Sequence, residues 1–179
     1  MHLDARQIRV LAHPLRFRLL GRLRIDGPAT ATGLAQALDT NTGATSYHLR
    51  QLAEVGLVVE EERPGRERWW RSAHDVSSWQ RDNYTGDADA TAAAAWLEGQ
   101  ALRSFVERAE AWQRSVDDES PEWREAANFS DYWLHLSPEQ MLALQADLDA
   151  VVERYREAGP APGARQVVFF MYGLPRADK

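Results

Sequence analysis

The chain contains no cysteine, which excludes disulfide bonds and thiolate metal sites. It also lacks long apolar runs, and no stretch approaches the roughly 18 consecutive apolar residues of a membrane-spanning helix. The first ten residues, MHLDARQIRV, hold no charged region followed by an apolar run, so no secretory signal is predicted. We therefore expect a cytoplasmic protein with no membrane partner.

Several catalytic motifs are absent as well. The sequence has no glycine-rich phosphate loop, no Gly-x-Ser-x-Gly turn and no His-Glu-x-x-His helix. Its histidines lack the i, i+4 spacing that would build a zinc site on one helix. We predict that the protein is not an enzyme and has no catalytic residues, no metal ligands and no cofactor. A His/Asp/Glu metal site between two subunits stays open as an alternative.

The most informative pattern present lies in residues 29–59. Thr30 has the residue type of an N-cap and begins a short helix, and residues 39–41 (Asp-Thr-Asn) supply turn chemistry. A second helix is predicted for residues 42–55. Two short helices joined by a polar turn are typical of a helix-turn-helix.

The second helix has a polar outer face suited to DNA. When successive residues are placed 100° apart around the helix axis, Leu49 and Leu52 share the buried face, and small and polar residues lie on the opposite side. The first turns of a recognition helix enter the major groove, where hydroxyl, phenol and guanidinium groups reach base edges and phosphates. His48 lies on the flank, where a core or phosphate-bonded imidazole is expected. The predicted DNA contacts from this helix are Thr42, Gly43, Ser46, Tyr47, His48, Arg50 and Gln51.

A β-hairpin pattern follows the second helix. Gly56 ends the helix, LVVEEE is typical of a strand, Arg63-Pro-Gly-Arg66 of a turn, and residues 67–71 of a returning strand. A hairpin placed directly after a recognition helix is a wing. Arg63, Arg66 and Arg68 are predicted to reach backbone phosphates or the minor groove.

Four segments occur in an order and spacing shared by a known family: LAHPLRFRLL at 11–20, TSYHLRQL at 45–52, VGLV at 55–58 and RERWW at 66–70. Together they resemble the ArsR-type winged helix-turn-helix transcriptional regulators over about the first 73 residues. The resemblance implies a dimeric transcription factor, most often a repressor, on a near-palindromic operator in double-stranded DNA. Many members sense metal through cysteines, which this sequence lacks.

Charge is divided unevenly along the chain. Residues 1–72 contain 11 Lys+Arg and 8 Asp+Glu, a net charge of +3, and the remainder contains 10 and 19, a net charge of −9. A negative total of −6 is therefore compatible with a DNA-binding N-terminal half. The acidic half is expected to face away from DNA.

A long helix is predicted for residues 90–116, after a transition region that begins near Ala73. Its apolar stripe runs from Leu97 to Val116 and is wider than one small neighbour would cover. We expect this helix to form a homodimer interface, with packing against a later helix of the same chain as the alternative.

The last third predicts a strand at Tyr132–Leu136, a helix capped by Ser137, and a strand at Val167–Leu174. This strand-helix-strand unit is expected to be structural and dimerising. Alternatively, it encloses a pocket for a small apolar effector. The candidate ligand-binding residues are Tyr132, Trp133, His135, Phe169, Met171 and Tyr172.

The sequence thus predicts an α+β, mainly helical fold. Residues 1–73 form a winged helix-turn-helix, and residues 74–179 hold the long helix and the small α/β unit. The predicted function is sequence-specific DNA binding by a homodimeric regulator. A winged-helix protein-interaction module without specific DNA binding, and a ligand-responsive regulator, are the alternatives. Operator, target genes, sign of regulation and effector have no signature in the sequence.

Overall fold

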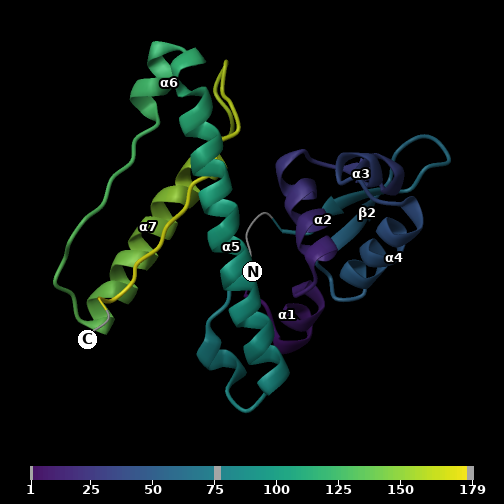
Figure 1. The fold of residues 1–179 in the computed structure, drawn as a ribbon, viewed down its shortest axis with the longest axis horizontal. Helices are drawn as coiled ribbons and strands as arrows, with labels where there is room; N and C mark the ends of the chain where they lie inside the picture. Colours follow the sequence, from purple (N-terminus) through teal and green to yellow (C-terminus); the bar gives the residue numbers. More distant parts are fainter. Residues whose placement is uncertain (1, 75–77, 177–179) are drawn as a thin grey trace. The chain divides into compact units, whose positions relative to one another are not determined.

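The computed structural model describes residues 2–74 and 78–176. Over these residues the chain forms helices α1 to α7 and one three-stranded antiparallel sheet (Figure 1). It divides into two compact units, Met1–Arg108 and Ala109–Lys179. The predicted fold class, mixed but mainly helical with an N-terminal winged helix-turn-helix, is confirmed.

Two N-terminal helices form the support of the first unit. α1 (Ala5–Leu11) begins in a capping box made by Asp4 and Gln7. α2 (Pro14–Ile25) follows at once, with Pro14 in its first turn and the His13 side chain accepting the Leu15 N–H. Leucines of both helices and the isoleucine of α1 are buried in the core, where α4 (Thr42–Ala53) and the sheet pack against them.

The helix-turn-helix consists of α3 (Ala31–Ala37) and α4 (Thr42–Ala53). Thr30 caps α3 as predicted, since its side chain accepts the Gly33 N–H. Asn41 caps α4 by accepting the Ala44 N–H at 2.7 Å. The α4 residues Thr45, Leu49 and Leu52 are fully buried, which fixes the opposite face toward solvent.

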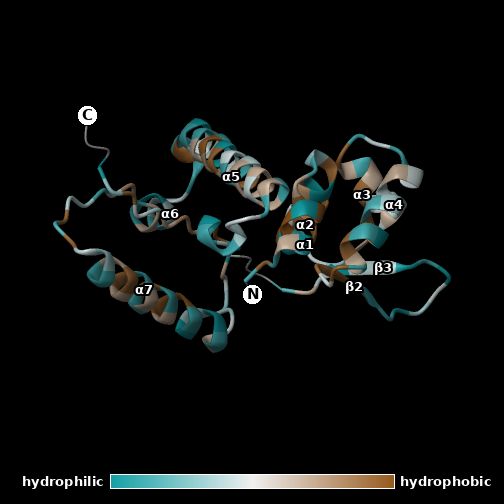
Figure 2. Cartoon of the chain, turned by 90° about the horizontal axis from the view of Figure 1, so that it is seen from below, coloured by the Kyte–Doolittle hydropathy of each residue, from teal (hydrophilic) through white to brown (hydrophobic). Residues whose placement is uncertain are grey.

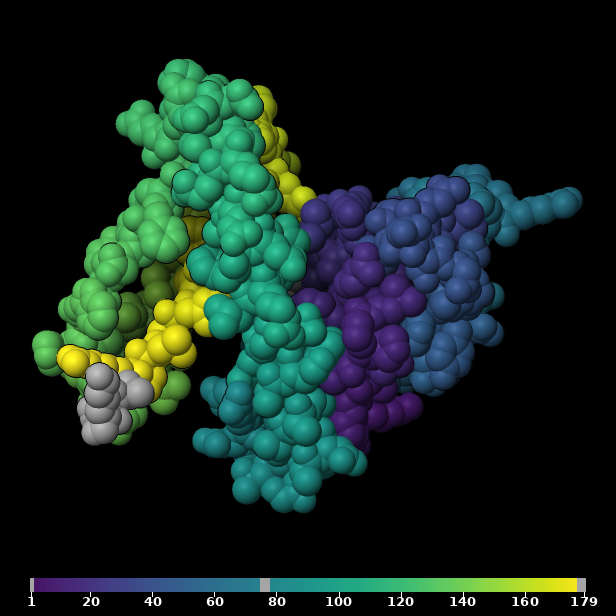
Figure 3. Space-filling model, in the orientation of Figure 1, coloured from purple at the N-terminus to yellow at the C-terminus, as the bar shows by residue number. Residues whose placement is uncertain are grey.

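The sheet has the strand order β1-β3-β2. β2 (Val58–Glu61) pairs with β3 (Trp69–Ser72) in the predicted hairpin, in the register Val58↔Ser72. β1 (Ala29–Thr30) pairs with the other edge of β3 and was not predicted, because two residues carry no alternation. Figure 3 shows the hairpin tip as a narrow projection from its unit.

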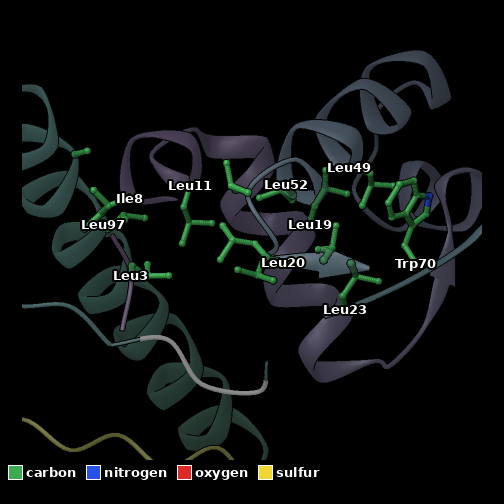
Figure 4. Packing of buried hydrophobic residues seen from close by; sticks show 14 of the residues in the cluster. Leu3, Ile8, Leu11, Leu19, Leu20, Leu23, Leu49, Leu52, Trp70 and Leu97 are labelled. Carbon is green, nitrogen blue, oxygen red and sulfur yellow. The ribbon is translucent and has the colours of Figure 1, made fainter. Parts of the chain in front are cut away.

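One hydrophobic core joins these elements to the start of α5 (Ala88–Ser115). Figure 4 shows Leu97 of α5 beside Ile8 of α1, and Leu49 and Trp70 at the other end of the same cluster. The 3₁₀ turn η1 (Arg81–Tyr84) contributes Tyr84, whose buried hydroxyl donates to the Leu3 carbonyl at 2.7 Å. The first compact unit therefore extends beyond residue 73. The functional division at residue 73 stays a prediction.

The second unit contains the end of α5, the 3₁₀ turn η2 (Val116–Asp118), α6 (Pro121–Ala126) and α7 (Pro138–Ala158). The capping box at Ser137 is confirmed. Figure 2 shows apolar residues interspersed with hydrophilic ones along α7. None of the described residues of this unit is buried, so it has no core of its own in the single chain.

The two strands predicted on either side of α7 are wrong. Residues 132–136 and 167–174 have no regular secondary structure and pair with no strand. Alternating or continuous apolar residues favour a strand only where a neighbouring strand satisfies the backbone N–H and C=O groups. Neither segment has such a neighbour, so neither forms a strand.

Candidate nucleic-acid interface

The outer face of α4 presents the residues predicted to read DNA. Tyr47 is 52% exposed and Thr42, Gly43 and Arg50 are also exposed, whereas Ser46 is half-buried. The Arg50 Nε donates to the Ser46 carbonyl at 3.2 Å, which lays the guanidinium along its own helix. The Gln51 amide donates to Glu54 at 3.1 Å, so its donor is already engaged within the helix.

A pocket of about 330 Å³ separates α4 from the hairpin. Hydroxyl side chains of α3 and α4 line the pocket, together with the guanidinium groups of Arg50 on α4 and of Arg68, which directly precedes β3. Its lining residues are Thr30, Ala31, Thr32, Thr42, Ser46, Arg50, Glu67, Arg68 and Trp70. Ser46 and Arg50 therefore face the wing side of the recognition helix.

Two of the three wing arginines are already engaged. The Arg63 guanidinium is 2.7 Å from a Glu61 carboxylate oxygen and lies over the Trp69 ring at 4.2 Å from its centroid. Arg68 pairs with Glu60 at 3.2 Å. Exposed ion pairs of this kind are weak, and a DNA phosphate would compete with each carboxylate.

Arg66 at the hairpin tip is different, because the described part of the chain gives it no ion pair or hydrogen bond. It is exposed and has the freest guanidinium of the wing. The hairpin as a whole is not basic, since residues 60–68 contain four glutamates and three arginines. Wing contact with phosphate therefore depends chiefly on Arg66.

His48 packs against a second imidazole that sequence reasoning did not connect with it. The His13 and His48 ring centroids are 4.4 Å apart, and Arg16 lies 3.5 Å from His48 Nδ1. Burial lowers the pKa of His48, and the His13 ring and the Arg16 guanidinium lower it further. Burial and then Arg16 lower the pKa of His13 in the same way. His13 and His48 are 35 positions apart in the sequence, so no local pattern predicts this contact.

The predicted effector residues do not line a closed pocket in the single chain. Trp133 is 83% exposed, Tyr132 82% and Phe169 74%, while Met171, Tyr172 and His135 are exposed as well. An apolar effector site among them stays a prediction. The described residues contain no group of three or more His, Cys, Asp or Glu side chains that could hold a metal ion.

Comparison with known proteins gives a helix-turn-helix domain family that matches residues 11–61. Over 62 residues the chain is 42% identical to the HTH-type transcriptional regulator NmtR of Mycobacterium tuberculosis. That match covers 35% of this chain and 50% of the relative.

Two crystal structures are similar to this chain. One is of a possible transcriptional regulator for arsenical resistance, 30% identical over 66% of this chain and 98% of that one, with a TM-score of 0.35. The other is of the ArsR family transcriptional regulator RHA00566, 29% identical over 55% of this chain and 93% of that one, with a TM-score of 0.33.

The N-terminal region of this chain belongs to the ArsR-type helix-turn-helix regulators. This confirms the family that the four sequence segments indicated. The matched helix-turn-helix domain, residues 11–61, contains α2, α3, α4 and the first strand of the wing, β2. The chain spans only half the length of the curated relative it matches. In the two described ranges, no helix is long and apolar enough to cross a membrane.

Proposed function

We propose that this protein is a sequence-specific DNA-binding transcriptional regulator that represses from a near-palindromic operator as a homodimer. It would act in the cytoplasm, where such a regulator meets its operator. The observation that carries the proposal is the outer face of α4. Gly43, Tyr47 and Arg50 are exposed on a helix whose opposite face is fully buried.

Rigidity of α4 supports a role in reading bases. Leu49 and Leu52 are fully buried, and the Gln7 amide donates to the Val55 carbonyl at 3.0 Å just beyond the helix end. Asn41 fixes the first turn. A recognition helix must hold its side chains in register with base edges, and a helix anchored at both ends does so.

The homodimer is proposed to form through residues 90–116. The first part of α5 packs in its own chain's core, with Ala90, Ala94 and Leu97 fully buried. Leu102 and Val106 farther along remain 55% and 44% exposed and are the better candidates for contact with a second copy. Two recognition helices would then lie about one DNA turn, roughly 34 Å, apart.

The test compares three arginine variants on two duplexes, one upstream of the protein's own gene and one scrambled. Arg50→Ala is expected to weaken binding to the specific duplex by about 1 to 3 kcal/mol and to relax sequence choice, because a base-reading guanidinium is lost. Arg66→Ala should weaken binding to both duplexes alike and reduce the salt slope by about 1, because a phosphate contact is lost.

Arg154→Ala is the charge-matched control, since Arg154 is exposed on α7, away from the winged helix in sequence. It should leave both affinities unchanged. If Arg50→Ala and Arg66→Ala behave like Arg154→Ala, DNA is not the partner of this surface. The winged helix would then be a protein-interaction module.

A further inference from the structure

Three groups with hydrogen-bond donors converge beside the recognition helix. His13 ends the α1–α2 connection, Arg16 lies on the first turn of α2, and His48 lies on α4. The two rings are 4.4 Å apart, and Arg16 Nη1 is 3.5 Å from His48 Nδ1. Arg16 Nε also donates to the Val10 carbonyl, which fixes the guanidinium in place.

The contacts determine the tautomers of both rings. A guanidinium can only donate, so His48 Nδ1 accepts from Arg16. His13 Nδ1 accepts the Leu15 N–H at 3.1 Å. Each neutral ring therefore carries its hydrogen on Nε2.

Neither Nε2–H group is fully buried. Among the described residues, no group forms a hydrogen bond with either Nε2. The same residues include no buried side-chain nitrogen or oxygen without a partner, so each unbonded Nε2 must have some contact with solvent. The charged or titratable groups that act on the rings are Arg16 and the other ring, and Tyr47 lies against His48 at 5.1 Å between centroids. None of these is an anion, so the cluster has donors without a counter-charge.

The cluster lies on the side of α4 that the wing does not cover. Ser46 and Arg50 line the pocket shared with the hairpin. His48 is two residues from Ser46, which is a turn of about 200° around the helix axis. A helix in the major groove has one phosphate backbone on each flank. The wing would approach one backbone and the cluster the other.

We propose that His13, Arg16 and His48 form a binding site for a DNA backbone phosphodiester on the flank of α4 opposite the wing. The inference rests on the proposed function, since it requires α4 to lie in the major groove. The Nε2–H groups donate to the phosphate oxygens, and Arg16 supplies the positive charge. His13 and Arg16 are thus added to the predicted DNA contacts.

The decisive variants are His48→Phe, which keeps a ring but loses the donor, and His48→Gln, which keeps an amide N–H. His48→Phe should weaken binding to the specific and the scrambled duplex alike by about tenfold, the loss of one hydrogen bond to a charged acceptor. His48→Gln should retain most of the affinity. Arg16→Gln should reduce the salt slope by about 1. Thermal unfolding of each variant tests whether it is folded.

Wild-type affinity and salt slope in a folded His48→Phe variant would overturn the site, even if Arg16→Gln unfolds through loss of the Val10 contact. Failure of the proposed function gives a different result. If the wild-type chain binds neither duplex, the regulator proposal fails as well. If Arg50→Ala weakens binding and His48→Phe does not, only the phosphate site fails.

Discussion

At the scale of single residues, similar side chains have unequal roles. Arg63 and Arg68 are paired with glutamates, whereas Arg66 has no such partner within the described chain. The sequence alone grouped all three as phosphate contacts, because one-letter spacing does not reveal which carboxylate a guanidinium meets. Arg63 pairs with Glu61 only two residues away, whereas Arg68 meets Glu60 because the hairpin register places Glu60 opposite Trp70.

The two imidazoles predict a pH-dependent stability. The pKa of His13 and of His48 is lowered in the folded chain from its ordinary value of 6.5. Below that value the unfolded chain binds protons before the folded chain does, so the free energy of unfolding falls as the pH falls. The contribution of the two neutral imidazoles to stability is fully present above about pH 6.5, and it is lost progressively as the pH drops toward their folded-state pKa values.

Thermal unfolding at about pH 7.5 and about pH 5.5 checks this prediction. His48→Gln does not titrate in this range, so it should lose less stability than the wild type over the same interval. An equal loss of stability in both proteins would show that His48 does not contribute to the pH dependence.

At the scale of elements, the sequence predicted the helices closely. The recognition helix was expected at residues 42–55 and is found at Thr42–Ala53, and the long helix expected at 90–116 is Ala88–Ser115. Helical periodicity and caps are local, so they can be seen without the fold. Strand pairing is not local, which is why β1 was missed and the two strands of the last third were wrongly predicted.

The candidate site divides in the same way. The exposed face of α4 follows from its period, because the burial of Leu49 fixes which residues face out. The contact of His48 with His13 and Arg16 depends on how α2 crosses α4, and no spacing within either helix shows it.

The cap of the recognition helix gives a prediction at this scale. Asn41→Ala removes the acceptor of the Ala44 N–H and should lower the free energy of unfolding by about 1 kcal/mol. Because the cap orders the first turn, which carries Gly43, specific binding should also weaken. Asn41→Ser keeps a capping oxygen and is the matched control. Urea unfolding measures the loss, and equal stability of both variants and the wild type would exclude a role for the cap.

At the scale of the whole molecule, the second unit exposes much of its apolar surface in the single chain. Its exposed aromatic residues include Phe129, Tyr132, Trp133, Phe169 and Tyr172. Contiguous exposed apolar surface is typical of sites covered by another chain or a ligand. A second copy is the partner that the regulator proposal requires.

Two charges on α5 test the dimer. Leu102→Asp together with Val106→Asp places carboxylates at positions that are already exposed in the single chain, so the fold of the first unit should persist. Sedimentation should then give a monomer where the wild type gives a dimer, and operator affinity should fall. Glu107→Asp, on the same helix with no change of charge, should remain dimeric. A double variant that stays dimeric would place the interface elsewhere.

The central claim, specific recognition of DNA by α4 and its wing, is tested most directly by the wild-type chain. Its affinity is measured for the duplex upstream of its own gene and for a scrambled duplex of equal length, at two salt concentrations. A preference of about a thousandfold or more that persists at the higher salt is predicted. Binding that is equally weak for both duplexes, and that selection from random sequences does not improve, would contradict the claim.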